Sequence, residues 1–424
     1  MNILLLISRE FADNMKLAWV VFANTWFLVL PVGFYYLFKL IWMDKVQIAF
    51  LCSIDYSLLE IIPPRDIERS PKPMESFFAG LTGVLKTFNT KEEFLKGMLT
   101  YKFSLELVSD GGAVHIYIRT PKMFRNLVEA NLYAQYPTVE ILESPDYVNE
   151  VPKIIPNKDW DLWGTDLQLV KPDAYPIKTY KKFEEEITGT MIDPLSAVIE
   201  VMGKVGPNQK IWFQYVIIPE KETWANTGQE VVQQLAGRSK KHKGVFSNIW
   251  NDIVDVLSNL SKGLLGGEFS FSGGEEKKEE SPLEFRLTPG EKEVLKALEE
   301  NIGKPVFKVK MRFIYLGLKE YFDKSMSSAF VGAIKQFNDN NLNAFKPHDE
   351  TKTYANYFMV EHRIKYRKRR IFKRFIDRDP TGLKFVLSTE ELATVFHLPD
   401  ISVMAPHITR VDAKKSGAPT NLPI

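Results

Sequence analysis

The stretch FSLELVSDGGAVHIYI, from Phe103 to Ile118, decides the fold. Apolar and polar side chains alternate on both sides of its Asp-Gly-Gly sequence, which is the period of a half-buried β-strand. Asp-Gly and Gly-Gly pairs are the residues that tight hairpin turns favour. The stretch therefore predicts an antiparallel β-hairpin.

The flanking segments complete a six-element unit. Before the hairpin come a short apolar strand at Ser57–Ile62 and helical spacing over Pro73–Lys86. After it, Thr120-Pro121 predicts a helix start, with proline at the first helical position, and Val139–Leu142 predicts a last strand. The order β-α-β-β-α-β is that of a ferredoxin-like sandwich.

The same order of signals recurs further along the chain, but with an insertion. Ile211–Ile217 and Val306–Tyr315 have strand periodicity, and about 85 residues separate them. Within the insertion, Val245–Leu265 is an amphipathic helix, and Gly266–Pro282 is expected to be disordered because it has little apolar content. The helix has two open interpretations, namely packing on a sheet or partner subunit, or lying on anionic lipid.

The predicted fold class is α+β, with a transmembrane helix before two tandem ferredoxin-like domains. The predicted organisation is a membrane anchor at 1–48, a first ferredoxin-like domain at 49–150, a second at 151–350 with an insertion at 220–303, and a basic segment, short helix and connector at 351–424.

The membrane anchor is predicted from Leu17–Phe38, which has twenty-two residues and no charged side chain. A helix rises 1.5 Å per residue, so about 20 apolar residues cross a bilayer core of roughly 30 Å. Aromatic residues gather towards and just past its C-terminal end, with Lys39 and Lys45 nearby, as at a membrane interface. A cleaved signal peptide is disfavoured because no small-residue cleavage site follows.

The composition is that of a globular protein, with 45% apolar and 25% charged residues and a net charge of +2. This balance gives no global attraction to nucleic acid, so any basic surface must be local. The one cysteine, Cys52, cannot form an internal disulfide. The folded part therefore needs no oxidising compartment, which agrees with a cytoplasmic location.

A basic run, RIKYRKRRIFKR, is the best candidate for contact with an anionic partner, either lipid head groups or nucleic acid. The alternative is a solvated helix or strand face whose apolar residues hold it to the body. The charged strand face of Lys308, Lys310 and Arg312 is a second candidate surface for nucleic acid. The residues of the basic run predicted to contact the anion are Arg363, Lys365, Arg367, Lys368, Arg369, Arg370, Lys373 and Arg374.

No motif indicates catalysis, a cofactor or a metal, so the chain is predicted not to be an enzyme. The segment Gly80–Thr87 lacks the glycine directly before lysine that a phosphate-binding loop requires. The six histidines show no metal-ligand spacing, and neither a GxSxG nor a CxxC sequence occurs.

Three longer stretches and the chain's last residues carry a family resemblance: Ile61–Leu81, Val114–Ile141, Phe385–Asp400 and the terminal APTNLPI. They resemble the membrane-anchored region, often described only as a domain of unknown function, that precedes the motor in type IV secretion or conjugation coupling ATPases of candidate-phylum bacteria. The resemblance covers most of Ile61–Ile424. In that family a phosphate-binding loop follows a segment like NLP, and this chain has none.

The resemblance implies a non-catalytic, membrane-proximal scaffold that anchors a DNA-translocating ATPase motor. The motor is either a separate subunit or a part of a longer chain. It implies a single pass through the bacterial inner membrane, with the C-terminal body in the cytoplasm. The alternative function is a membrane-tethered module that binds nucleic acid or anionic lipid. A homo-oligomer, and DNA contact through the basic run, stay open as further partner hypotheses.

Overall fold

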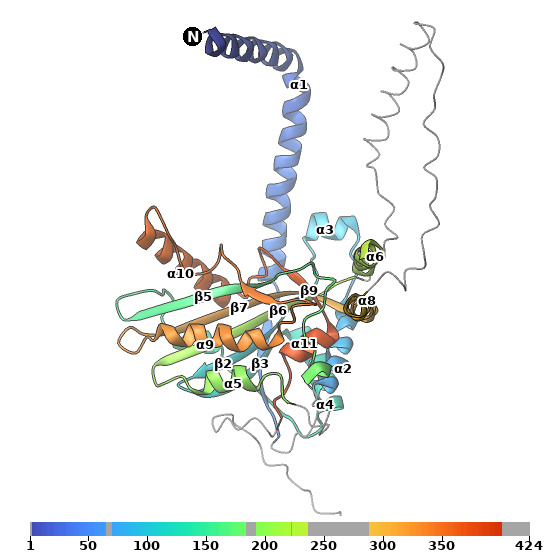
Figure 1. The fold of residues 1–424 in the computed structure, drawn as a ribbon, viewed down its shortest axis with the longest axis vertical. Coiled ribbons are helices and arrows are strands. Elements are labelled where there is room, and N and C mark those ends of the chain that lie inside the picture. The colour runs from blue at the N-terminus through green and yellow to red at the C-terminus, as the bar shows by residue number, and fades with distance from the viewer. Residues whose placement is uncertain (1, 65–69, 184–191, 222, 236–287, 401–424) are drawn as a thin grey trace, which may run out of the picture. The chain divides into compact units, whose positions relative to one another are not determined.

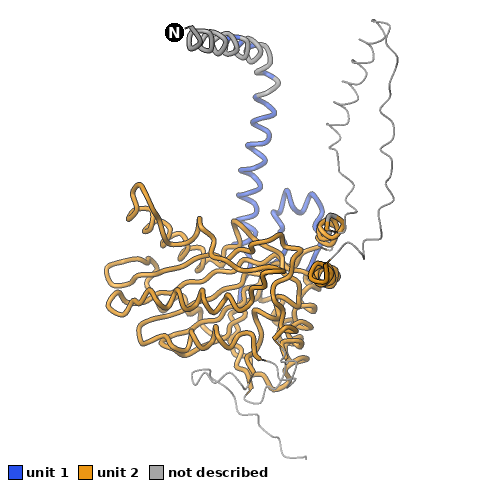
Figure 2. Tube along the Cα trace, viewed as in Figure 1, with its two compact units in different colours: residues 1–56, 85–101 blue, residues 57–84, 102–424 orange. Residues whose placement is uncertain are grey.

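The computed structural model describes residues 2–64, 70–183, 192–221, 223–235 and 288–400. The predicted helix at Val245–Leu265, the predicted disordered tract at Gly266–Pro282 and the chain after Asp400 lie outside these residues. The described part contains ten α-helices and nine strands with antiparallel pairing, so the predicted α+β class is confirmed. The chain divides into two compact units (Figure 2).

Unit 1 comprises residues 1–56 and 85–101 and contains two helices, α1 (Asn2–Cys52) and α3 (Thr90–Lys96). The two helices pack together, because the Trp42 indole N–H donates to the Phe94 carbonyl oxygen at 2.8 Å. The predicted anchor Leu17–Phe38 lies within α1, and ten of its side chains are outside the described set. Among the residues that are described, no helix is both long enough and apolar enough to cross a membrane.

Unit 2, residues 57–84 and 102–424, is built on one sheet (Figure 1). The strand order is β4-β1-β3-β2-β6-β7-β5-β8, with β9 on β7. The strands are β1 (Tyr56–Ile62), β2 (Phe103–Asp110), β3 (Ala113–Pro121), β4 (Glu140–Glu143), β5 (Trp160–Leu169), β6 (Gln209–Pro219), β7 (Val306–Leu318), β8 (Phe345–Pro347) and β9 (Phe385–Ser388). The two predicted domains therefore share a continuous sheet, joined where β2 pairs with β6.

The described part of unit 2 contains eight α-helices, and the predicted helix over Pro73–Lys86 corresponds to the first of them. They are α2 (Lys72–Leu81), α4 (Arg125–Gln135), α5 (Ser196–Gly203), α6 (Thr223–Leu235), α8 (Pro289–Ile302), α9 (Lys324–Ile334), α10 (Val360–Ile376) and α11 (Thr389–Val395). Capping boxes begin α8, at Thr288 and Glu291, and α11, at Ser388 and Glu391. The predicted start at Thr120-Pro121 is wrong, because both residues end strand β3 and α4 begins at Arg125 after a 3-10 turn.

The two faces of the sheet are covered differently. Phe313 stacks on Phe330 of α9 at 3.8 Å between ring centroids, so α9 covers the face on which Phe313 lies. The neighbouring residue Arg312 points to the opposite face, since strand side chains alternate. On that opposite face Trp212 packs against Phe372 and Phe375 of α10, at 6.4 and 5.3 Å between centroids. The C-terminal half of α10 is therefore docked on the sheet.

Candidate anion-binding helix

All eight basic residues of the predicted site lie on α10. Its buried side consists of Ile371, Phe372 and Phe375. The helix packs closely against Gly164 of β5. A Cβ added at Gly164 would lie only 3.3 Å from the Ile371 Cδ1 atom, so a larger residue would crowd the helix. With one side fixed in this way, the charges fall on the flanks and the opposite side of the helix.

Four of the eight basic residues are engaged within the protein. The Lys368 ammonium lies 2.5 Å from the Asp161 carboxylate, and the Arg374 guanidinium lies 3.5 Å from that of Asp379. Arg363 donates to the Asn356 carbonyl oxygen at 2.9 Å. Arg367 donates to backbone carbonyl groups of the segment before the helix, those of Asp349, Lys352 and Tyr354. These residues hold α10 in place.

The other four, Lys365, Arg369, Arg370 and Lys373, are exposed and have no carboxylate partner in the described part of the chain. We call these four residues the outer face of α10. Lys365, Arg369 and Lys373 follow one another at intervals of four, so they lie along one stripe of the helix. Like charges at this spacing destabilise a helix slightly, and binding an anion would relieve their repulsion.

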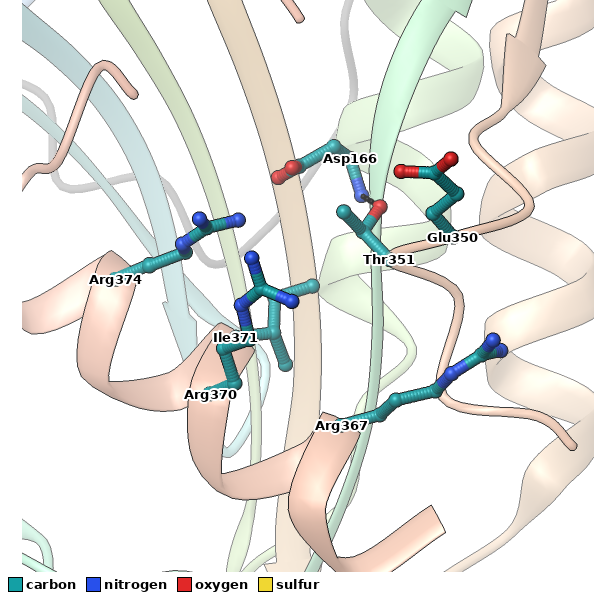
Figure 3. A pocket seen from close by; sticks show the side chains of 7 residues that line it. All are labelled: Asp166, Glu350, Thr351, Arg367, Arg370, Ile371 and Arg374. Carbon is teal, nitrogen blue, oxygen red and sulfur yellow. Dashed lines mark hydrogen bonds between the residues drawn. The ribbon is translucent and has the colours of Figure 1, made fainter. Parts of the chain in front are cut away.

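A small hollow lies beside the outer face (Figure 3). Arg370 and Arg374 line it together with Thr351, whose hydroxyl oxygen accepts a 3.0 Å hydrogen bond from the Asp166 backbone N–H. Figure 3 shows Arg367 extending away from these two arginines. The Asp166 carboxylate is already paired with Lys310 and Arg312, but the Glu350 carboxylate lines the hollow as well, so the hollow has charges of both signs.

The second predicted surface, the strand face of Lys308, Lys310 and Arg312, is wrong as an exposed site. Arg312 is 0% and Lys310 2% exposed, because α10 and the segment after it cover this part of the sheet. Both cations pair with Asp166, at 2.9 and 2.7 Å. Burial lowers the pKa of Lys310. The negative charge of Asp166 acts in the opposite direction but does not cancel this effect. Only Lys308 remains partly exposed, and it pairs with Glu220.

A row of buried polar side chains crosses four strands beneath α10. Glu106, Gln214, Arg312 and Asp166 stand directly opposite one another in the register of β2, β6, β7 and β5. Gln214 donates to the Glu106 carboxylate at 3.1 Å, and to the Phe375 carbonyl oxygen at 3.2 Å. We call these four residues the polar row. It links both halves of the sheet to the end of α10.

Arg378, two residues beyond α10, closes this network. Its guanidinium lies 3.0 Å from Glu106 and 2.6 Å from Asp146, and Glu106 also accepts hydrogen bonds from Ser104 and Tyr147. Although burial opposes ionisation of Glu106, the Arg378 charge and these hydrogen bonds lower its pKa to about 2. The pair is thus ionised and structural. Sequence analysis missed it, although the alternation Ser104–Leu105–Glu106 did place Glu106 on the face opposite Leu105.

The described residues show no arrangement that would hold a metal, since no group of three or more His, Cys, Asp or Glu side chains converges. His397, which follows α11, pairs with Asp193 at 3.0 Å. Burial raises the pKa of Glu391 to about 7, but this carboxylate accepts hydrogen bonds from the Ser388 and Ile177 backbone N–H groups at 2.9 Å. Glu391 thus serves as a helix cap.

These features define an α+β protein with a nine-stranded antiparallel sheet, a buried ionic network and an exposed basic helix. The chain belongs to the family described as a domain of unknown function (DUF8128), whose model matches residues 52–411. The match begins at the last residue of α1 and includes all of α10. No curated protein matches the chain.

Proposed function

We propose that this protein is a non-catalytic scaffold tethered to a membrane by α1. One observation carries the proposal. The large apolar residues in the stretch from Val32 to Phe38 are each at least 53% exposed. Seven consecutive residues cover almost two helical turns, so apolar side chains point outward in all directions. A helix that is apolar all round needs lipid or protein around it, and lipid also fits the uncharged length of Leu17–Phe38.

The proposal extends to the two halves of unit 2, which we regard as tandem ferredoxin-like modules. Both halves have the β-α-β-β-α-β element order of a ferredoxin-like module. Their strand orders, β4-β1-β3-β2 in the first half and β8-β5-β7-β6 in the second, are also equivalent. The insertion between β6 and β7 interrupts the central hairpin of the second module. Such modules provide a rigid body on which a partner can assemble, while the fold itself specifies no chemistry.

The membrane tether is tested by flotation of the full chain with phosphatidylcholine vesicles. The test variant carries Val32→Asp, Phe34→Asp and Leu37→Asp, and the control carries Lys292→Asp and Lys296→Asp on α8. We expect wild type and control to float and the test variant to stay at the bottom, because each carboxylate costs about 3 kcal/mol in a bilayer core. Equal flotation of all three would contradict the tether.

The partner implied by the resemblance is a DNA-translocating ATPase motor, at the bacterial inner membrane with the body of this chain in the cytoplasm. The proposal predicts that the tagged full chain, purified in mild detergent from its native cells, retains an ATPase subunit with a Walker A loop. Purification without any ATPase, after cross-linking in intact cells, would contradict the scaffold role.

The second candidate function is binding of nucleic acid, which the unpaired cations of the outer face favour. Counterion release then predicts that duplex DNA affinity falls steeply with salt, and that Lys365→Glu with Arg369→Glu makes the slope shallower by about two. Lys368→Glu is a poor test variant, because it breaks the pair with Asp161. Absence of salt-dependent DNA binding would remove this candidate.

A further inference from the structure

The segment that leads into α10 exposes four consecutive apolar or aromatic side chains. Tyr357 is 88%, Phe358 81%, Met359 55% and Val360 37% exposed. We call these four residues the apolar tip. Single exposed apolar residues are ordinary, but a contiguous group of this size on a protein surface marks an interaction site.

The base of the apolar tip is fixed to the sheet. Thr353 exchanges two hydrogen bonds with Gly164 of β5, one from its backbone N–H and one to its hydroxyl oxygen, each 3.0 Å long. Arg363 and Arg367 of α10 donate to carbonyl groups at Asn356 and Lys352, at 2.9 and 3.1 Å. The segment is thus held at its start and along α10, while the tip itself projects into solvent.

The backbone of the tip is also unusual. Tyr357 and Met359 have φ angles of 68° and 50°, in the left-handed region that residues with a Cβ rarely adopt. Such conformations cost free energy and concentrate at binding sites. The tip therefore combines a strained backbone with exposed apolar side chains. Both properties cost free energy when the protein is in water without a partner.

The neighbouring surface of α10 indicates what covers the tip. The outer face carries four unpaired cations, and among them lies Tyr366, 63% exposed. Apolar side chains beside a basic, tyrosine-containing helix face are typical of segments that lie at a membrane interface. Nucleic acid fits the cations equally well, and Tyr357 and Phe358 offer surfaces for base stacking. The exposed aliphatic side chains of Met359 and Val360 offer none, and they fit the apolar part of a membrane interface better.

We infer that the apolar tip inserts into the head-group region of a bilayer, and that the outer face of α10 binds anionic lipid head groups beside it. The inference rests on the proposed membrane function and adds a second contact, made by unit 2. It also identifies the anionic partner of the predicted basic run as lipid. Basic residues near such a surface attract anionic lipid, and the apolar residues supply the depth of insertion.

The single cysteine of the chain makes a direct test feasible. Full-length Cys52→Ser, Phe358→Cys protein is labelled with a polarity-sensitive fluorophore and mixed with vesicles of phosphatidylcholine and phosphatidylserine. We expect a blue shift, an increase in emission of about twofold or more as the probe leaves water, and quenching by nitroxide-labelled lipid. The same fluorophore at Met123→Cys, on an exposed turn of unit 2, should not respond.

The charge requirement is tested with Lys365→Glu, Arg369→Glu and Lys373→Glu added to the labelled protein. These positions are exposed, so we expect the fold to be kept. The change should abolish the response while flotation through α1 persists. A label that stays unchanged on vesicles with which the protein floats overturns this inference and leaves the tether intact. A response to duplex DNA alone, without vesicles, also overturns it. Failure to float at all overturns both.

Discussion

Glu106 and Arg378 show how a single buried pair can determine where a helix ends. Arg378 lies in the left-handed region, with φ at 47°, and is 2% exposed. Lys102 donates to its carbonyl oxygen at 2.7 Å, and Arg378 itself donates to that of Ile376 at 3.0 Å. The pair therefore fixes the turn after α10 as well as neutralising two buried charges.

Replacing Glu106 tests this role. Glu106→Gln leaves the buried Arg378 guanidinium with only Asp146 as a charged partner, and we expect the free energy of unfolding to fall by about 3 kcal/mol at neutral pH. Because the pKa of Glu106 is lowered to about 2, its contribution is present above its ordinary pKa of 4.5 and is lost as the pH falls towards 2. The variant should lack this acid-dependent loss. Glu129→Gln, at an exposed pair with Arg125, is the control and should cost less than about 1 kcal/mol.

The effect of Glu391 on the free energy of unfolding should have the opposite pH dependence to that of Glu106. Its pKa is raised to about 7 by burial, so its contribution to stability is complete below pH 4.5 and declines as the pH rises towards 7. Glu391→Gln removes the ionisation but keeps only one accepting oxygen, so it can retain the hydrogen bond from Ser388 or that from Ile177 but not both. The variant should therefore be less stable at every pH, and denaturant unfolding across this range should show wild type losing about 3 kcal/mol more than the variant as the pH rises. Parallel pH profiles for the two proteins would argue against a raised pKa.

At the scale of elements, α10 depends on a close approach to β5. A Cβ at Gly164 would lie 2.9 Å from the Phe313 carbonyl oxygen and 3.3 Å from Ile371. Gly164→Ala should therefore destabilise the protein by about 2 kcal/mol, by forcing the strand and helix apart. Gly332→Ala on α9, where nothing lies within 4 Å, is the matched control and should be neutral or stabilising by up to about 1 kcal/mol. Thermal unfolding of both variants measures the difference.

Local signals predicted most elements correctly, while the burial of individual charges needed tertiary contacts. The hairpin at Asp110–Ala113 and the capping boxes depend on residues close in sequence. Lys310 and Arg312 have the spacing of a solvated strand face, yet Asp166 and α10 bury them. Periodicity cannot distinguish a charged face in water from one that meets a distant carboxylate. The eight basic residues of α10 were correctly grouped, but only contacts separate the outer face from the engaged residues.

At the scale of the whole molecule, unit 2 is one sheet. The pairing of β2 with β6 joins segments about a hundred residues apart in the sequence. Local sequence patterns do not show which distant strands pair with each other. The polar row crosses this junction, since Gln214 contacts Glu106 on one side and Arg312 on the other. The two halves therefore share backbone hydrogen bonds, an ionic network and the cover of α10.

This continuity predicts one cooperative unfolding transition for the described part of unit 2. Differential scanning calorimetry of the full chain in detergent should show a single main peak, and both Glu106→Gln and Gly164→Ala should shift it as a whole. Two separated peaks, with Gly164→Ala moving only one of them, would indicate that the halves unfold as independent domains.

The most direct test of the membrane-tethered scaffold is photolabelling from within the bilayer. The full chain is reconstituted into vesicles that contain phosphatidylserine and a photoactivatable lipid with its reactive group in the acyl chain, and adducts are mapped by mass spectrometry. We predict dense adducts on Leu17–Phe38, a second cluster on Tyr357–Val360, and none on buried strands such as β6. Adducts absent from Leu17–Phe38, on vesicles that bind the protein, would contradict the account.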